Sequence, residues 1–157
     1  MIIGILVYSY TGNTLMVAEK IKKQILKNGD SAQIHKVTCI NGDPNGRQTL
    51  VLKDVPDLSG YNKLIIGAPI NGFSLCKAMK IYFQMNKIKA SQVNCFVTQY
   101  FKSAHFGGNR GIKQISEHIV KQGVKVNNTA IIHWSSKDRD KQIENAAQLL
   151  SQFEEKS

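Results

Sequence analysis

The sequence of 157 residues contains few cysteines, few prolines and no long hydrophobic run. Its three cysteines, Cys39, Cys76 and Cys95, are odd in number and widely spaced, which argues against a disulfide framework and against a zinc site. No apolar segment reaches the roughly 20 residues that a membrane helix needs, and residues 2–8 lack the flanking features of a signal peptide. With no Pro/Ser-rich linker either, we expect one cytoplasmic domain over residues 1–157.

Acidic residues are also scarce. The chain has 11 Asp+Glu against 21 Lys+Arg, a formal net charge of +10. Such a balance is typical of proteins that meet nucleic acid, a membrane surface or an anionic partner, but it also describes a merely lysine-rich surface. The basic residues are spread over both halves of the chain without a nucleic-acid motif, so we expect no nucleic-acid and no membrane partner. The four histidines are scattered, and we expect no metal site.

Apolar segments alternate with amphipathic ones along the chain. Continuous apolar runs at 2–8, 64–68, 93–97 and 130–134 predict buried strands, and the more polar segment 32–37 predicts an edge strand. Apolar residues at helical spacing predict four helices, over Thr14–Ile25, Leu75–Tyr82, Ile112–Val120 and Ile143–Phe153. Gly29 and Gly123 are expected to end the first and third helices, and Ser135 or Ser136 to cap the fourth. Residues 41–61 stay unassigned beyond the turn residues at 41–46.

This alternation predicts an α/β fold, a parallel sheet with helices on both faces. Right-handed crossovers and an edge position for the second strand give a doubly wound sheet of order 2-1-3-4-5. Ligands bind such sheets beyond the carboxyl ends of the strands, near the switch point between strands 1 and 3. The loops after Tyr8, Ala68 and Val97 are therefore the candidates for a site.

The first of these loops is suited to binding phosphate. It reads Ser9-Tyr10-Thr11-Gly12-Asn13-Thr14 and leads from a buried strand into a helix, whose N-terminus offers free N–H groups and a partial positive charge. Hydroxyls of Ser9, Thr11 and Thr14 can donate to phosphate oxygens, Gly12 tolerates a positive φ, and Asn13 can tie the loop to its neighbours. Neither the Walker lysine nor the GxGxxG fingerprint is present, which favours a monophosphate over tightly held ATP, GTP or NAD.

This hexad resembles the flavodoxin phosphate loop, Ser/Thr-x-Thr-Gly-Asn-Thr, at every position. The resemblance extends over nearly the whole chain, because length and strand order also agree. It implies a flavodoxin-like three-layer sandwich with a five-stranded parallel sheet, and FMN as a non-covalent cofactor. The alternative is a capped helix start with polar turn residues.

The second loop resembles the flavodoxin loop that covers one face of the flavin ring. It contains Pro69, Ile70, Asn71, Gly72 and Phe73. Many flavodoxins have a tryptophan here, whereas this chain offers Phe73 to stack on the ring or Ile70 to pack flat against it. The alternative is that Phe73 is a core anchor.

The third loop resembles the region that supplies the second ring face. It contains Thr98, Gln99, Tyr100 and Phe101, followed by Gly107 and Gly108. Tyr100 is the first candidate for stacking and Phe101 the second. The two glycines either bring backbone N–H groups to the flavin or form an ordinary turn before the next helix. The common flavodoxin Gly-Asp dipeptide is missing.

The charge around these loops departs from the resemblance, since typical flavodoxins are acidic. No Asp or Glu lies between Leu58 and Ser116, and the same span holds eight cations: Lys63, Lys77, Lys80, Lys87, Lys89, Lys102, Arg110 and Lys113. A positive rim would favour the reduced, anionic flavin and make its reduction potential less negative. It would also attract a partner with an acidic docking face, or NAD(P)H. The alternative is that these cations lie far from the flavin.

The resemblance implies an FMN-binding electron-transfer protein that shuttles electrons between redox partners, with no catalytic acid, base or nucleophile. One alternative is a small FMN-dependent reductase of NAD(P)H:quinone type. Another is a flavodoxin-fold module that has lost flavin redox function.

Overall fold

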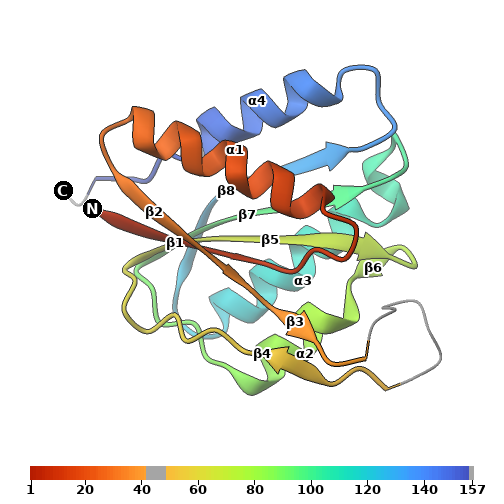
Figure 1. Cartoon of the computed structure of the whole chain (residues 1–157), viewed down its shortest axis with the longest axis horizontal. Coiled ribbons are helices and arrows are strands. Elements are labelled where there is room, and N and C mark those ends of the chain that lie inside the picture. The colour runs from red at the N-terminus through yellow and green to blue at the C-terminus, as the bar shows by residue number, and fades with distance from the viewer. Residues whose placement is uncertain (42–48, 156–157) are drawn as a thin grey trace.

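A computed structural model describes residues 1–41 and 49–155 of the chain (Figure 1). Its centre is a sheet whose five main strands are all parallel and follow the order β2-β1-β5-β7-β8. These strands are β1 (Ile2–Val7), β2 (Ser31–Lys36), β5 (Lys63–Asn71), β7 (Gln92–Gln99) and β8 (Lys125–His133). The predicted order 2-1-3-4-5 is confirmed, with one addition: the short β6 (Ser74–Leu75) pairs antiparallel with the end of β5.

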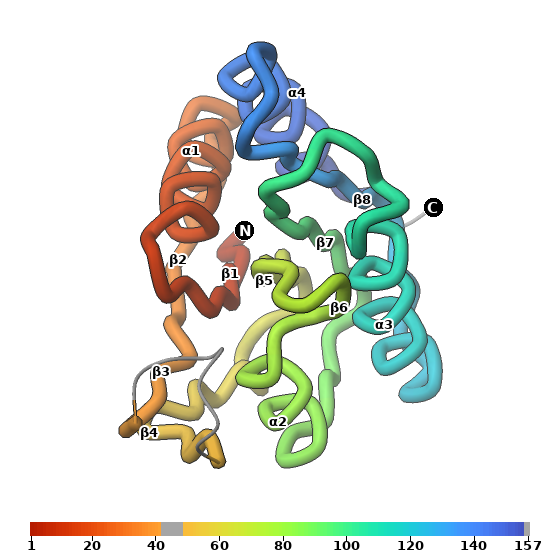
Figure 2. The backbone as a smooth tube through the Cα atoms, turned by 90° about the vertical axis from the view of Figure 1, so that its right-hand side faces the viewer, coloured from red at the N-terminus to blue at the C-terminus, as the bar shows by residue number. Residues whose placement is uncertain are grey.

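Helices cover both faces of this sheet (Figures 1 and 2). One face carries α1 (Asn13–Lys27) and α4 (Arg139–Leu150), and the other carries α2 (Lys77–Met85) and α3 (Gly108–Val120). Side chains alternate along the strands, so that Ile3 and Ile5 of β1 pack under α1 and α4 while Leu6 packs toward α2 and α3. The structure is therefore the three-layer sandwich that the alternation of strands and helices predicts.

The helices mostly follow the predicted apolar stripes. In α1 the buried residues are the five that the spacing predicts: Thr14, Val17, Ala18, Ile21 and Ile25. The second helix starts later than predicted, because Leu75 pairs with Ile70 in β6. In α3, Ile115 and Ile119 are buried, but Val120 is 59% exposed, since consecutive residues of a helix point in directions about 100° apart.

The predicted limits of the last helix are wrong at both ends. Its N-cap is Asp138 rather than Ser135 or Ser136, and the Ser136 hydroxyl instead accepts a hydrogen bond from the Asp138 amide at 3.1 Å. The helix ends at Leu150, and Phe153 lies beyond it against the same hydrophobic cluster. Residues that continue an apolar stripe after a helix has ended can still face the core, which is why the spacing extends too far.

The unassigned segment supplies one strand of a small two-stranded ribbon beside α2, and the residues just before the segment supply the other. Strands β3 (Thr38–Cys39) and β4 (Leu52–Asp54) pair antiparallel there. Most of the turn predicted at 41–46 lies outside the described residues.

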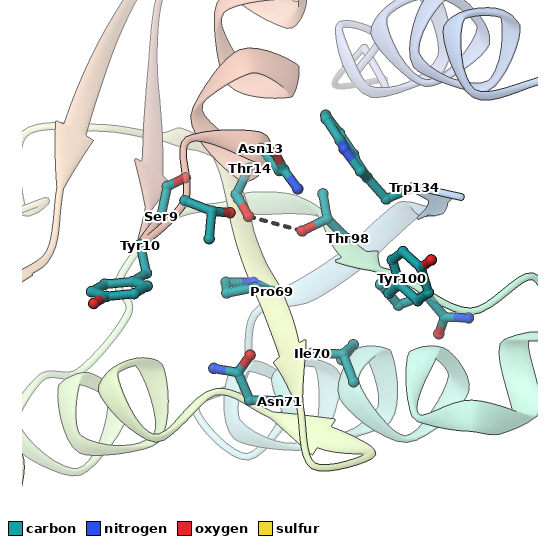
Figure 3. Close-up of a pocket in the computed structure, with 12 residues that line it drawn as sticks. Ser9, Tyr10, Asn13, Thr14, Pro69, Ile70, Asn71, Thr98, Tyr100 and Trp134 are labelled. Atoms are coloured by element: carbon teal, nitrogen blue, oxygen red, sulfur yellow. Dashed lines mark hydrogen bonds between the residues drawn. The ribbon is translucent and has the colours of Figure 1, made fainter. Parts of the chain in front are cut away.

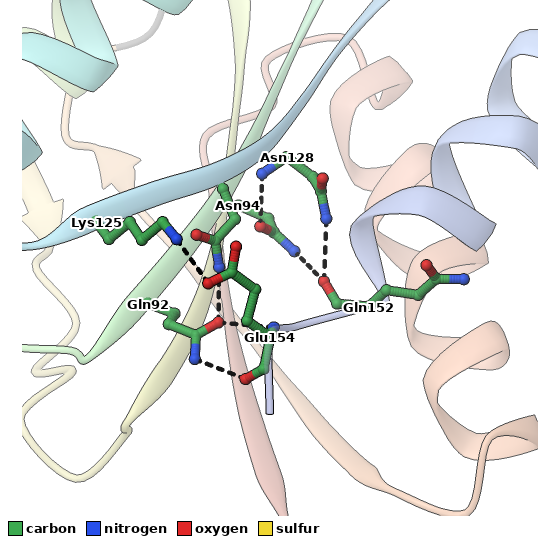
Figure 4. A network of polar contacts seen from close by, with 7 residues as sticks. Gln92, Asn94, Lys125, Asn128, Gln152 and Glu154 are labelled. Atoms are coloured by element: carbon green, nitrogen blue, oxygen red, sulfur yellow. Dashed lines mark hydrogen bonds and ion pairs between the residues drawn. The ribbon is translucent and has the colours of Figure 1, made fainter. Parts of the chain in front are cut away.

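The amino end of the sheet is closed by polar side chains that hold the segment after α4 (Figure 4). Asn94, which is fully buried, donates to the backbone oxygens of Leu150 and Gln152, both at 2.9 Å. Gln92 exchanges two hydrogen bonds with the backbone of Glu154. This network fixes the C-terminal segment against β7 and away from the loops at the carboxyl end. No helix in the described parts of the chain has the length and hydropathy to cross a membrane.

Candidate functional site

The loop between β1 and α1 presents amide groups without acceptors at the start of the helix. Gly12 is its N-cap with φ +94°, which confirms the expected positive φ. The Ser9 hydroxyl oxygen accepts from the amides of Gly12 and Leu15, at 3.1 and 3.2 Å. Within residues 1–41 and 49–155, the amides of Asn13 and Thr14 donate to no protein acceptor. The first turn of α1 therefore has two free donors and its dipole to offer an anion.

A pocket opens beside this loop, and Asn13 and Thr14 are among the residues that line it (Figure 3). Its volume is about 170 Å³, and its walls come from the ends of β1, β5, β7 and β8. Its lining residues are Ser9, Tyr10, Thr11, Asn13, Thr14, Pro69, Ile70, Asn71, Thr98, Gln99, Tyr100 and Trp134. All of them except Trp134 belong to the three loops that the sequence singles out. The described lining contains no charged side chain, so the polarity of the pocket comes from hydroxyls, amides and the helix end.

Two hydroxyls link the phosphate loop to the third loop. The Thr14 and Thr98 side-chain oxygens lie 2.9 Å apart, and both residues are almost fully buried. One of the two donates to the other, so one hydroxyl hydrogen of the pair stays available for a ligand. Asn13, by contrast, does not tie the loop to its neighbours as predicted: its side chain lines the pocket and makes no hydrogen bond to a described residue.

Trp134 is the lining residue that sequence reasoning missed. It follows β8 and lies beside Asn13 and Thr98 in Figure 3. The Arg139 guanidinium stacks over its ring at 4.7 Å and donates to its backbone oxygen at 3.1 Å, which fixes the indole in place. Its position at the carboxyl end of the strand predicted over 130–134 was a usable signal, because every parallel strand ends at the same edge of the sheet.

The second loop is a tight hairpin between β5 and β6. Gly72 and Phe73 form its tip with φ of +58° and +61°, and Phe73 is the only described non-glycine residue with positive φ. The alternative that Phe73 anchors the core is wrong, since its side chain is half exposed. It does not line the pocket, whereas Ile70 does.

The third loop is fixed to the sheet by its backbone. The Gln99 side-chain amide donates to the backbone oxygens of Phe101 and Ser103, at 2.7 and 2.6 Å. The amide of Ser135 donates to the Tyr100 oxygen at 3.2 Å. Tyr100 lines the pocket, whereas Phe101 does not and lines an adjoining hollow instead.

A second, smaller hollow of about 110 Å³ adjoins the pocket and shares Ile70, Gln99 and Tyr100 with it. Aromatic rings form most of its wall. Phe73 stacks on Phe101 with ring centroids 5.8 Å apart, and Phe106 lies 5.2 Å from Phe101. The second and third loops are thus in direct contact through their aromatic side chains.

Gly107 and Gly108 serve packing in the structure rather than lining the pocket. Gly107 has φ +111° and caps α3, and a Cβ there would lie 2.7 Å from the Phe73 backbone carbon and 2.5 Å from Ile70. A Cβ on Gly108 would lie 2.5 Å from the Gln99 side-chain oxygen. The turn before the helix is therefore the alternative that the structure shows, and it holds the second and third loops together.

The thiols nearest the pocket offer no nucleophile. Burial raises the pKa of the Cys76 and Cys95 thiols to about 12, so both stay protonated near neutral pH. Burial also raises the pKa of the half-buried Cys39.

Several solved structures share this architecture, although no protein-family model and no curated protein sequence matches the chain. Oxidised flavodoxin 1 from Bacillus cereus is 14% identical with a TM-score of 0.65, covering 98% of this chain and 100% of that one. Two-electron reduced flavodoxin from Megasphaera elsdenii is 19% identical with a TM-score of 0.62, covering 93% and 98%. A flavoprotein from Lactobacillus acidophilus in complex with FMN is 20% identical with a TM-score of 0.60, covering 89% and 97%. The chain has the flavodoxin-like fold.

In this fold the eight Lys and Arg residues of the acid-free stretch lie at both ends of the sheet. Lys63 begins β5, and Lys87 and Lys89 lie between α2 and β7, so these three are at the amino end, away from the pocket. The other five lie toward the carboxyl end, on the first turns of α2 and α3 or in the third loop: Lys77, Lys80, Lys102, Arg110 and Lys113. The expected positive rim is therefore smaller than the sequence count suggests.

Proposed function

We propose that this protein binds FMN non-covalently in the pocket between the phosphate loop and the ends of β5 and β7. The observation that carries the proposal is the pair of backbone amides on Asn13 and Thr14, which lack acceptors among the described residues and belong to residues that line a pocket without charged side chains. A phosphate monoester satisfies such donors without needing a cation. The FMN that the Lactobacillus acidophilus flavoprotein holds supports this choice of ligand.

The residues present fit the parts of FMN. The free amides and the hydroxyls of Ser9, Thr11 and Thr14 would hold the phosphate. Tyr100, Ile70 and Trp134 provide ring and aliphatic surface for the flavin. Small-molecule pockets usually enclose about 300–1,000 Å³, and this pocket of about 170 Å³ is smaller. FMN would therefore be only partly enclosed, with part of its ring system at the surface.

We further propose that the protein is an electron carrier between redox partners. Bound FMN supplies the chemistry, because a flavin accepts and donates electrons one or two at a time, and the protein binds and orients it. The lining described above contains no carboxylate, imidazole, amine or thiol that could act as acid, base or nucleophile. An exposed ring edge suits electron exchange with a protein that docks from outside.

One observation favours a second candidate, a small reductase of NAD(P)H:quinone type. The aromatic hollow next to the pocket could receive a planar ring close to the flavin. In that case NADPH alone would bleach the bound flavin, whereas a pure carrier would need a protein donor.

A titration with FMN tests the first proposal. The chain has a single tryptophan, Trp134, and it lines the pocket, so its fluorescence reports directly on ligand binding. We expect FMN to quench it at low micromolar concentration or below, riboflavin to bind much more weakly because it lacks the phosphate, and inorganic phosphate to compete.

Two glycine variants give a matched control, since they lie at opposite ends of α1. Gly12 and Gly29 both have φ near +90° and both have open space where a Cβ would lie. Gly12→Ala and Gly29→Ala should therefore lose similar stability, at least ~1 kcal/mol, but only Gly12→Ala should weaken FMN binding. Equal FMN affinity in both variants, or equal affinity of the wild-type protein for riboflavin and FMN, would contradict a phosphate site in this loop.

A further inference from the structure

Four aromatic side chains gather on the surface beside the pocket. Phe73 is 53% exposed, Tyr100 69%, Phe101 46% and Phe106 48%. They come from the second and third loops, and the three phenylalanine rings contact one another with centroids 5.2–6.0 Å apart. We call Phe73, Phe101 and Phe106 the aromatic patch, because Tyr100 beside them lines the pocket and is assigned to the flavin. Scattered apolar residues are normal on a protein surface, but a contiguous exposed patch marks an interaction site.

The aromatic patch stands on a backbone that is already fixed. The Gln99 side-chain amide donates hydrogen bonds to the backbone oxygens of Phe101 and Ser103, and the Ser135 backbone amide donates one to the backbone oxygen of Tyr100. Gly107 packs directly on the backbone of Phe73. A partner that binds here would order little of the chain, so that less of the binding free energy is lost to entropy.

The border of the aromatic patch is basic. Lys102 follows Phe101 directly, and Arg110 and Lys113 are exposed on the first turns of α3. The N-terminal end of α3, which adds a partial positive charge, has no acidic residue in its first turn. Because no Asp or Glu occurs between residues 58 and 116, neither of the loops nor the first half of α3 supplies a carboxylate to offset these cations. The nearest ion pair, Lys113 with Glu117 at 3.9 Å, is solvent-exposed and weak.

We propose that the aromatic patch docks a partner protein whose contact face has an apolar centre bordered by Asp and Glu side chains. The proposal deepens the proposed function, on which it rests for the partner's role as a redox protein. An apolar centre buries the aromatic rings, and carboxylates around it complement Lys102, Arg110 and Lys113 and speed association.

Single-stranded nucleic acid is the competing class of partner, because it also binds aromatic and basic side chains. The ring contacts favour a protein. Base stacking needs free ring faces, and Phe73 and Phe101 each turn one face toward the other, with an interplanar angle of 24°. The rings thus form one joined apolar surface instead of separate stacking platforms, which suits aliphatic side chains of a protein.

The experiment is an NMR titration of the 15N-labelled full chain, with and without FMN. The probe is a synthetic peptide with a Leu-Phe-Leu centre flanked by three glutamates on each side, and the same peptide with lysines in place of glutamates is its control. We expect shifts confined to the two loops and the start of α3, an affinity that falls with salt, and no binding of the lysine peptide.

Charge-reversed variants locate the interaction. Lys102→Glu combined with Arg110→Glu should weaken the glutamate peptide about tenfold or more. Lys20→Glu combined with Lys23→Glu makes the same change in net charge on α1, which covers the opposite face of the sheet, and should leave peptide binding nearly unchanged. FMN affinity should be the same in both double variants, because none of these four residues lines the pocket.

Three outcomes would overturn the docking surface: no binding of the glutamate peptide, equal weakening by both double variants, or a thymidine oligomer that binds the same residues more tightly than the peptide does. Loss of FMN binding with the peptide interaction intact would instead contradict the proposed function and leave the docking surface standing.

Discussion

The two ends of the sheet differ in whether their hydrogen-bonding groups find partners within the chain. At the amino end, the side chains of Gln92 and Asn94 are bonded to backbone groups of the segment after α4 (Figure 4). At the carboxyl end, the amides of Asn13 and Thr14 find no acceptor within the described chain, and aromatic rings stay exposed. The polar side chains of the amino end are used within the chain, whereas the carboxyl end leaves two backbone donors unused, as the proposed FMN site requires. Substitutions at the two ends should therefore differ in what they change.

The largest expected effect on stability is at the amino end. Asn94→Leu would leave the Leu150 backbone oxygen without its donor and the Asn128 backbone amide, which donates to Asn94 at 2.9 Å, without its acceptor, and it would remove one of the two donors to the Gln152 oxygen. We expect a loss of about 3 kcal/mol or more in the free energy of unfolding, measured by urea denaturation.

Gln152→Ala is the control for Asn94→Leu, because residue 152 contributes only its backbone oxygen to these contacts. It should change stability by less than about 0.5 kcal/mol. Without denaturant, FMN affinity should be the same in both variants as in the wild-type protein. If Asn94→Leu lowered FMN affinity together with stability, the two ends of the sheet would not have separate roles.

The next effect concerns the junction of the second and third loops. Gly107→Ala introduces a Cβ against Ile70 and the Phe73 backbone at a φ of +111°, and we expect a loss of about 2–3 kcal/mol. Gly123→Ala has a φ of +79° and open space, so its loss should be near 1 kcal/mol. Thermal unfolding compares the two. If the two variants lost equal stability, the second and third loops would be able to move apart at little cost, and the contact at Gly107 would not fix the aromatic patch.

A smaller effect is expected on the reduction potential of bound FMN. The cations beside the third loop should favour the reduced, anionic flavin, so the potential should be less negative than in acidic flavodoxins. Lys102→Glu with Arg110→Glu should lower it by tens of millivolts at most, because these charges interact through water. Lys87→Glu with Lys89→Glu, at the other end of the sheet, should have a still smaller effect. A redox titration measures both variants. If the reduction potential of FMN shifted equally in the two, the distance of the substituted cations from the pocket would not determine their effect.

The smallest effect is a pH dependence at the amino end. Burial lowers the pKa of His118; a hydrogen bond with the Asn86 backbone opposes this shift in part, and nearby Lys121 adds a smaller lowering. The unfolded chain therefore binds the proton more readily. Stability should be full above about pH 6.5 and should fall as the pH drops through the window below it. The urea concentration at half unfolding, measured over this pH range, checks the prediction. In His118→Gln this concentration should fall less as the pH drops, whereas in His105→Gln, where the residue lies in an exposed turn, it should fall as in the wild-type protein.

Local patterns predicted most of the fold and of the pocket. The buried stripe of α1, the strand order and the hexad from Ser9 to Thr14 depend on neighbouring residues, and the structure places them as the sequence indicates. Trp134 and β6 depend on contacts between distant segments, which spacing does not report. Phe73 shows a further limit, since an apolar residue type does not reveal whether the side chain is buried.

The charge pattern shows how topology redistributes what a linear count brings together. Eight cations in one acid-free stretch suggested a single positive rim, but Lys63, Lys87 and Lys89 lie at the opposite end of the sheet. Which end a residue occupies depends on whether it precedes or follows its strand, so the element boundaries are needed before charge can be assigned to a site.

The hydrogen bonds of Asn94 also determine which contacts can form first while the chain is being synthesised. Asn94 and its acceptor on Leu150 are 56 residues apart in sequence. At about 5–20 residues per second, the ribosome needs roughly 3–11 s to add that stretch. During this interval strand β7 is complete, but the side-chain NH2 group of Asn94 lacks its two acceptors on Leu150 and Gln152. The last layer of the molecule therefore closes only after synthesis has passed α4, and the nascent strand must be kept from other contacts until then.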